Sequence, residues 1–83
     1  MNKKELSNYI FNFWLDWGAY NYEPLSDEEI LKSIEENLST TKGIERELNF
    51  IKHEFEAGWS EESLEYKNLK KLQKLVNDYK EGK

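Results

Sequence analysis

Apolar residues recur with helical spacing in four separate stretches of the chain, and this periodicity limits the possible folds more than any other feature. At about 100° per residue, most apolar side chains of the first, second and fourth stretches fall within an arc of about 100° to 140°, as expected for helices that face a core. The sequence therefore predicts an all-α fold, a small single-domain bundle of about four helices near residues 3–17, 27–38, 43–57 and 61–79.

Capping residues support the first two of these helices. Asn2 is followed three residues later by Glu5, and Ser26 is followed in the same way by Glu29. This spacing is typical of a capping box, in which the cap side chain and the later acid satisfy otherwise unpaired backbone N–H groups. We therefore expect the two helices to begin directly after Asn2 and Ser26.

The other helix ends have similar signals. Gly58 is well placed to end the third helix in a left-handed conformation. Ser60 is the expected cap of the fourth helix, with Trp59 packing on Leu64 as a hydrophobic staple. Whether the first helix continues past Gly18 stays open, because a glycine can either end a helix or lie within it.

Length and composition indicate one helical domain that spans residues 1–83. Separate cores form only in chains well beyond about 150 residues, and the aromatic residues of this chain supply large side chains for burial. The apolar stretch 9–17 is interrupted by Asn12 and Asp16, so we expect neither a signal peptide nor a membrane span. A cytoplasmic location is the corresponding expectation.

Few residues of the sequence are suited to catalysis. The chain has no cysteine, which excludes disulfides, thiolate zinc sites and cysteine nucleophiles. The single histidine, His53, is expected on the surface. The spacings typical of a metal site or a glycine-rich phosphate loop do not occur in the sequence. We therefore expect no enzymatic activity, no cofactor and no metal.

Charge is distributed unevenly along the chain. The net charge is −5, but residues 23–65 carry four basic and thirteen acidic side chains, whereas residues 66–83 carry six basic and two acidic ones. An acidic block of this kind repels a nucleic-acid backbone and complements a basic cleft on a protein. The charge pattern thus favours a basic protein surface as the partner, rather than a membrane or nucleic acid.

Two surfaces are candidates for contact with this partner. On the second and third helices, acids that should point away from the core accompany Phe50, which lies outside the core arc. These acids are Glu28, Glu35, Glu36, Glu47 and Glu54. On the first helix, Phe11 and Leu15 also lie outside the core arc, and Tyr22 would continue their stripe. These three residues either pack in the core around a central helix or form a partner or homodimer interface.

Two functional hypotheses follow from these surfaces. In the first, the chain is a small acidic non-enzymatic protein-binding module that inhibits a basic nucleic-acid-handling protein. Phage and mobile-element proteins such as anti-CRISPR and antirestriction proteins often have this size and acidity, although no motif links the chain to one family. In the second, it is a helical nucleic-acid-associated regulatory protein that dimerises through its first helix. That protein would contact phosphates through a basic row, Lys67, Lys70, Lys71 and Lys74.

Overall fold

A computed structural model describes residues 1–17 and 26–82, and four helices account for 80% of the described residues. The helices are α1 (Lys3–Trp17), α2 (Asp27–Leu38), α3 (Thr41–Phe55) and α4 (Leu64–Lys80). No strand occurs in these two ranges, so the predicted all-α fold is confirmed. Within the same ranges, no helix has both the length and the apolar character needed to cross a membrane.

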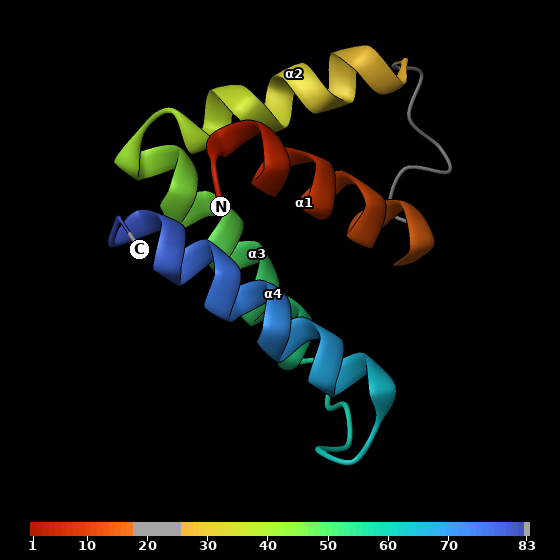
Figure 1. The fold of residues 1–83 in the computed structure, drawn as a ribbon. Helices are drawn as coiled ribbons and strands as arrows, with labels where there is room; N and C mark the ends of the chain where they lie inside the picture. Colours follow the sequence, from red (N-terminus) through yellow and green to blue (C-terminus); the bar gives the residue numbers. More distant parts are fainter. Residues whose placement is uncertain (18–25, 83) are drawn as a thin grey trace.

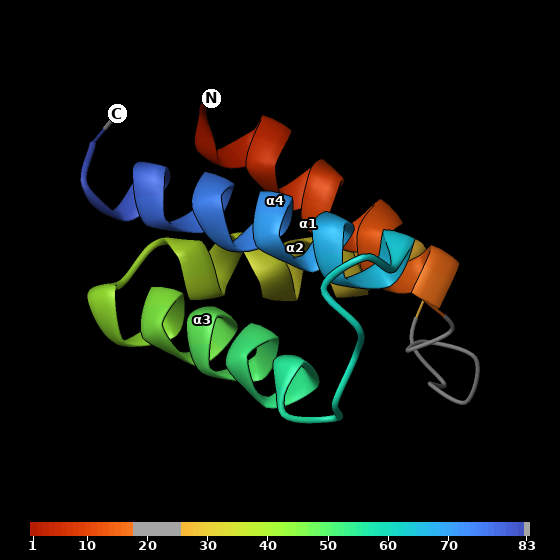
Figure 2. The same cartoon turned by 90° about the horizontal axis from the view of Figure 1, so that it is seen from below.

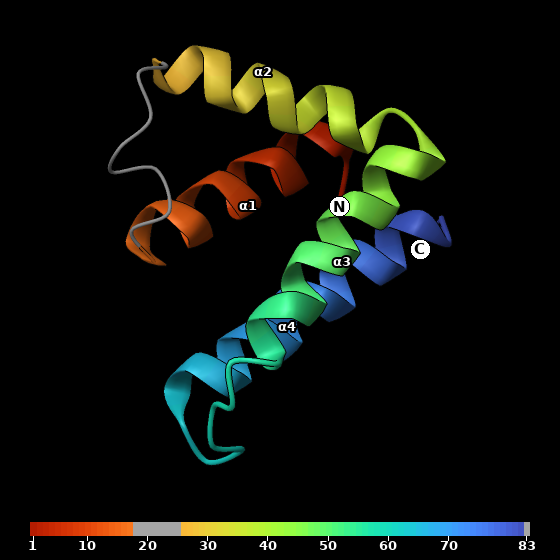
Figure 3. The same ribbon diagram turned by 180° about the vertical axis from the view of Figure 1, so that it is seen from behind.

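The helices form two antiparallel pairs that diverge from a common end. α1 packs along α2, and α3 packs along α4 (Figure 1; Figure 2). The pairs meet where α1 begins, α2 leads into α3 and α4 finishes, and we call this region the closed end. They separate toward the last turn of α1, residues 56–63 and the first turn of α4, and we call this region the open end (Figure 3).

Apolar side chains from all four helices form the core. Those buried are Leu6, Ile10, Phe11, Trp14, Ile30, Ile34, Leu38, Ile44, Ile51, Leu69, Leu72 and Val76. Phe11 belongs to this core although it lies outside the arc predicted for the first helix. Leu64 is the opposite case, because the sequence predicted that Trp59 packs on it and it is nevertheless 69% exposed.

The predicted start of α1 and both predicted bounds of α2 are confirmed. The backbone N–H of Glu5 donates to Asn2 Oδ1 over 2.8 Å, and Glu5 Oε1 accepts from the N–H of Asn2 over 3.3 Å. At the start of α2, Ser26 Oγ accepts from the N–H of Glu29 over 3.3 Å. Both helices therefore begin where local capping chemistry places them. The question of a continuation past Gly18 falls outside the described residues.

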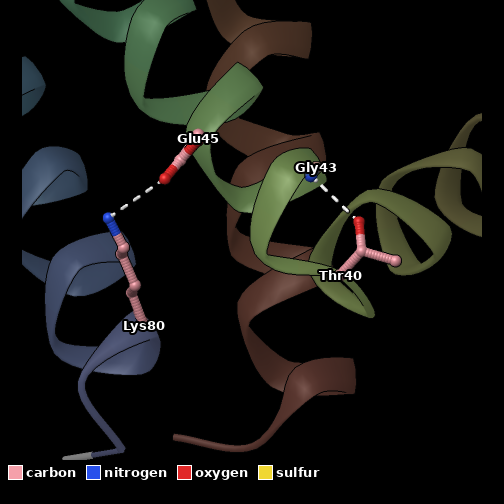
Figure 4. Close-up of polar contacts among 4 residues, drawn as sticks. All are labelled: Thr40, Gly43, Glu45 and Lys80. Atoms are coloured by element: carbon pink, nitrogen blue, oxygen red, sulfur yellow. Dashed lines mark hydrogen bonds and ion pairs between the residues drawn. The ribbon is translucent and has the colours of Figure 1, made fainter.

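α3 is displaced by two residues from the predicted range of 43–57. Thr40 is its cap, and Thr40 Oγ1 accepts from the N–H of Gly43 over 2.9 Å (Figure 4). The sequence suggested a later start because a glycine in a polar segment resembles a helix break. Gly58 has a φ of 89°, which confirms the left-handed residue predicted after this helix.

α4 begins three residues later than predicted, because Ser63 rather than Ser60 is its cap. Ser63 Oγ accepts from the N–H of Tyr66 over 3.1 Å. Ser60 lies in the preceding turn, where its carbonyl accepts from the N–H of Ser63 over 3.0 Å. The two serines offer the same capping group, so local chemistry alone does not distinguish between them.

Polar contacts join different helices at the closed end. Lys3 Nζ donates to Ser39 Oγ over 3.1 Å, which links the start of α1 to the residue after α2. Lys80 Nζ lies 3.7 Å from Glu45 Oε1 and links the last turn of α4 to α3 (Figure 4). These contacts are partly exposed, so each stabilises the fold by at most about 1 kcal/mol, and each lies within one helical pair.

Gly43 allows the first turn of α3 to approach the last turn of α2 closely. A Cβ atom at this position would lie 2.0 Å from the carbonyl oxygen of Asn37. Real Cβ atoms do not come this close to backbone oxygen, so only glycine fits without movement of one helix. The angle between α2 and α3 therefore depends on this residue.

Candidate functional site

The five predicted acids have different surroundings in the structure. Glu28 and Glu36 are exposed on α2, whereas Glu35 on the same helix and Glu54 on α3 are half-buried. α2 and α3 pack against each other, so these acids belong to neighbouring helices. The exposed pair, Glu28 and Glu36, is the part of this set that a partner can reach without displacing other side chains.

Glu47 lies between α2 and α3 rather than on an open face. Its Oε1 accepts a hydrogen bond from Asn37 Nδ2 over 3.3 Å, and its side chain is half-buried. Burial raises the pKa of Glu47 above its usual value of 4.5, because desolvation disfavours the charged form, and the hydrogen bond from Asn37 opposes this shift. The sequence predicted that Glu47 points away from the core, and the structure places it partly between α2 and α3.

Phe50, the predicted aromatic anchor, is 47% exposed and belongs to a larger group of rings. It packs edge-on against Trp14 of α1, with the ring centroids 4.8 Å apart and the ring planes at 88°. Trp14 is buried, so Phe50 covers a core residue while part of its own ring stays in solvent. We call the group to which both belong the aromatic cluster: Phe13, Trp14, Trp17, Phe50 and Trp59.

The aromatic cluster extends from α1 to the connection between α3 and α4, residues 56–63. Trp17 stacks on Phe13 with the ring centroids 5.3 Å apart and meets Trp59 edge-on at 5.6 Å. Trp59 thus packs on α1, whereas the sequence predicted a staple on Leu64, which is mostly exposed. Rings from α1, from α3 and from the connection therefore meet near the open end.

A groove lies beside the aromatic cluster, and we call it the open-end groove. Its volume is about 400 Å³. The described residues that line it come from α1, the connection and α4: Phe13, Asp16, Trp17, Trp59, Leu64, Glu65 and Asn68. This set includes two exposed carboxylates, Asp16 and Glu65, and neither lysine nor arginine. The open-end groove therefore combines aromatic walls with negative charge.

The structure separates Phe11 from Leu15. Phe11 is 7% exposed and belongs to the core, whereas Leu15 is 42% exposed one helical turn closer to the open end. Tyr22, the third residue of the predicted stripe, lies outside the described residues. For Phe11 the structure thus supports the core alternative, and Leu15 is the member of the pair that a partner can contact.

Two lysines of the predicted basic row lie over aromatic rings of the same chain. Lys70 Nζ is 5.6 Å from the ring centroid of Tyr66, and Lys71 Nζ is 6.0 Å from that of Tyr9. Both distances are within the range of a cation–π interaction. These two ammonium groups therefore already have favourable contacts within the chain.

The described residues contain no cluster of three or more His, Cys, Asp or Glu side chains that could hold a metal ion. His53 is exposed, and its Nδ1 lies 3.8 Å from Glu56 Oε2 across one helical turn. Comparison with known proteins gave no match to a family model, to a curated protein or to a solved structure. The function must therefore be inferred from the residues of this chain.

Sequence reasoning missed the open-end groove. The sequence pattern assigned Trp59 to a staple on Leu64, and Asp16 was noted only because it interrupts an apolar stretch. One signal was available, because Trp59 directly follows the helix-ending Gly58 and therefore belongs to a connection, where binding residues are common. No local pattern in the sequence predicts the contact between Trp59 and the end of α1.

Proposed function

We propose that this chain is a non-enzymatic protein-binding module that occupies a basic surface of a nucleic-acid-handling protein. Such a module would act as an inhibitor, in the manner of small phage or mobile-element anti-CRISPR and antirestriction proteins. The observation that carries the proposal is the half-exposed ring of Phe50, which is held on Trp14 next to a strongly acidic part of the chain. An exposed aromatic anchor beside acids complements a basic groove.

The acids and the aromatic residue would act at different stages of binding. Exposed acids such as Glu28 and Glu36 increase the rate of encounter with a positive surface, because opposite charges steer the approach. This attraction extends only about 8 Å at physiological ionic strength. A ring such as Phe50, already positioned by Trp14, buries apolar area after contact and slows dissociation.

The second hypothesis, a nucleic-acid-associated regulatory protein, has less support. Its basic row contains no arginine, which is the residue best suited to bidentate base recognition. Lys70 and Lys71 already lie over tyrosine rings. Dimerisation through α1 would use Leu15 without Phe11, because Phe11 is buried within the chain.

Neutralising the exposed acids tests the proposed function. Glu28→Gln with Glu36→Gln changes the net charge from −5 to −3, and Asn8→Lys with Asn77→Lys makes the same change at exposed positions on α1 and α4. We expect the Gln variant to associate more slowly with a basic partner captured from the native host, and the Lys variant to associate at a rate closer to that of the wild type. Phe50→Ala should increase the dissociation rate.

Surface plasmon resonance at several salt concentrations measures these rates. Wild-type kinetics from both the Gln variant and Phe50→Ala, with folding intact, would contradict the proposal. Binding of the wild-type chain to heparin or duplex DNA that weakens steeply with salt would favour the nucleic-acid hypothesis instead.

A further inference from the structure

We infer that the open-end groove binds an arginine side chain. The tryptophan rings would lie on one side of the guanidinium group, and the carboxylates of Asp16 and Glu65 on the other. This inference deepens the proposed function and rests on it, since the arginine would belong to the basic partner. It assigns a chemical class to one contact, whereas the proposal above concerns the acidic segment and Phe50.

The size and position of the open-end groove suit a single long side chain. Its volume of about 400 Å³ falls within the range of about 300 to 1,000 Å³ that small-molecule pockets occupy. Phe13 and Trp17 of α1 line it together with Trp59 and Leu64, so apolar surface is available for the methylene groups of the incoming residue. Leu64 is 69% exposed, and an arginine in the groove would cover part of this surface.

The tryptophan rings favour a cation with a flat shape. Trp17 and Trp59 meet edge-on with their planes at 78°, so the two rings present differently oriented surfaces to the groove. Tryptophan is the strongest aromatic partner for a cation. A guanidinium group is planar and weakly hydrated, so it stacks on such a ring more readily than the compact ammonium group of lysine.

The charges of the groove favour a cation from both sides. Asp16 lies in the last described turn of α1, and this turn carries no basic residue that would offset its carboxylate. A bound cation would therefore pair with a charge that no residue of this turn compensates. Glu65 lies in the first turn of α4, where its charge offsets the positive end of that helix.

Other occupants fit these residues less well. A phosphate or an acidic peptide would be repelled by the two carboxylates. An apolar side chain would match the rings, but it would remove the carboxylates from water without a partner, which is costly. Arginine satisfies both the rings and the carboxylates, because its guanidinium group can stack on an aromatic face and donate paired hydrogen bonds to a carboxylate.

An NMR titration of the full chain with N-acetyl-arginine amide tests this inference. The matched probe is N-acetyl-citrulline amide, which has nearly the same shape without the charge. We expect saturable shifts of the indole N–H signals of Trp17 and Trp59, while the signal of Trp14, which is 3% exposed and does not line the groove, moves less. Citrulline amide should bind about tenfold more weakly, because the charge-assisted hydrogen bonds are lost.

Variants identify the carboxylates. Asp16→Asn with Glu65→Gln should weaken binding of arginine amide about tenfold without weakening that of citrulline amide. Glu61→Gln with Glu62→Gln makes the same charge change at exposed residues that precede α4 and do not line the groove, so it should bind almost as the wild type does. The first pair should fold normally, because both side chains are exposed and the changes keep their size.

Equal binding of the two amides would overturn the inference, and so would equal losses in the two double variants. The same variants separate this inference from the proposed function when they are tested on the basic partner. If Glu28→Gln with Glu36→Gln weakens the complex and Asp16→Asn with Glu65→Gln does not, the inference is wrong and the proposed function stands. If arginine amide binds as expected and the partner is insensitive to all these changes, the groove is an arginine site and the proposed function is wrong.

Discussion

The closed end and the open end of the molecule are held together by different kinds of contact. At the closed end, Lys3 bonds to Ser39, Lys80 pairs with Glu45, and the backbone of Gly43 packs directly on α2. At the open end, aromatic rings from α1, α3 and the connection before α4 meet edge to face. The approach of Gly43 to α2 therefore constrains the angle between the helical pairs at the closed end, and the open end leaves apolar surface in solvent.

This difference concentrates exposed apolar surface at the open end and along α3. The exposed large apolar residues of this region are Leu15, Phe50, Trp59 and Leu64. Exposed apolar residues that occur together mark interaction sites more often than scattered ones do. The closed end has no comparable group among its described residues, apart from Met1 at the start of the chain.

The largest change in stability is expected from substitutions in α1, where Phe11 is buried and Leu15 lies nearer the open end. Phe11→Ser should lower the free energy of unfolding by about 3 to 5 kcal/mol, because a buried aromatic ring is lost. Leu15→Ser, one turn closer to the open end, should change it by less than about 1 kcal/mol. Urea denaturation followed by circular dichroism measures both values. Similar losses in the two variants would mean that the open end of α1 is packed as tightly as its middle.

A smaller effect is expected for Gly43→Ala at the closed end. The new Cβ would collide with the carbonyl oxygen of Asn37, so one helix must move, at a cost of about 1 to 3 kcal/mol. In an open helical position the same change would stabilise the chain. Lys42→Ala, at the exposed neighbouring residue, is the control and should have little effect. If Gly43→Ala were stabilising in thermal unfolding, the close approach of α2 and α3 would not constrain the closed end.

The smallest effect concerns Glu47, between α2 and α3. Its pKa is raised by burial, so the charged form is penalised in the folded protein relative to the unfolded one. The penalty is absent below the unfolded value of 4.5 and is complete once the pH exceeds the folded pKa, so stability falls as the pH rises through this interval.

Glu47→Gln keeps an oxygen that can accept from Asn37 and removes the charge. We therefore expect this variant to be slightly more stable than the wild type near pH 7, with the difference disappearing at acidic pH. Denaturation curves over this pH range measure it. A variant that is less stable at neutral pH would show that the hydrogen bond to the charged carboxylate outweighs its desolvation.

The residues of the candidate site differ in how far the sequence could predict them. Phe50 was identified as exposed because it lies outside the arc of its own helix, and the structure leaves about half of its surface in solvent. The partial burial of Glu47 was not predicted, because the helical arc of α3 gives no information about α2. Asn37 of α2 donates a hydrogen bond to Glu47. Asp16 and Glu65 could not be paired from the sequence, since they lie on the first and last helices.

The sequence by itself determined the number of helices, the caps of α1 and α2 and most of the core. These features depend on contacts between residues one to four positions apart, which the sequence states directly. Only the tertiary structure decided that Ser63 caps α4, that Phe11 is buried and that Trp59 and Glu65 line one groove with the end of α1. These outcomes depend on the angle between the two helical pairs. That angle results from packing between distant segments, such as Gly43 on α2, which no local pattern specifies.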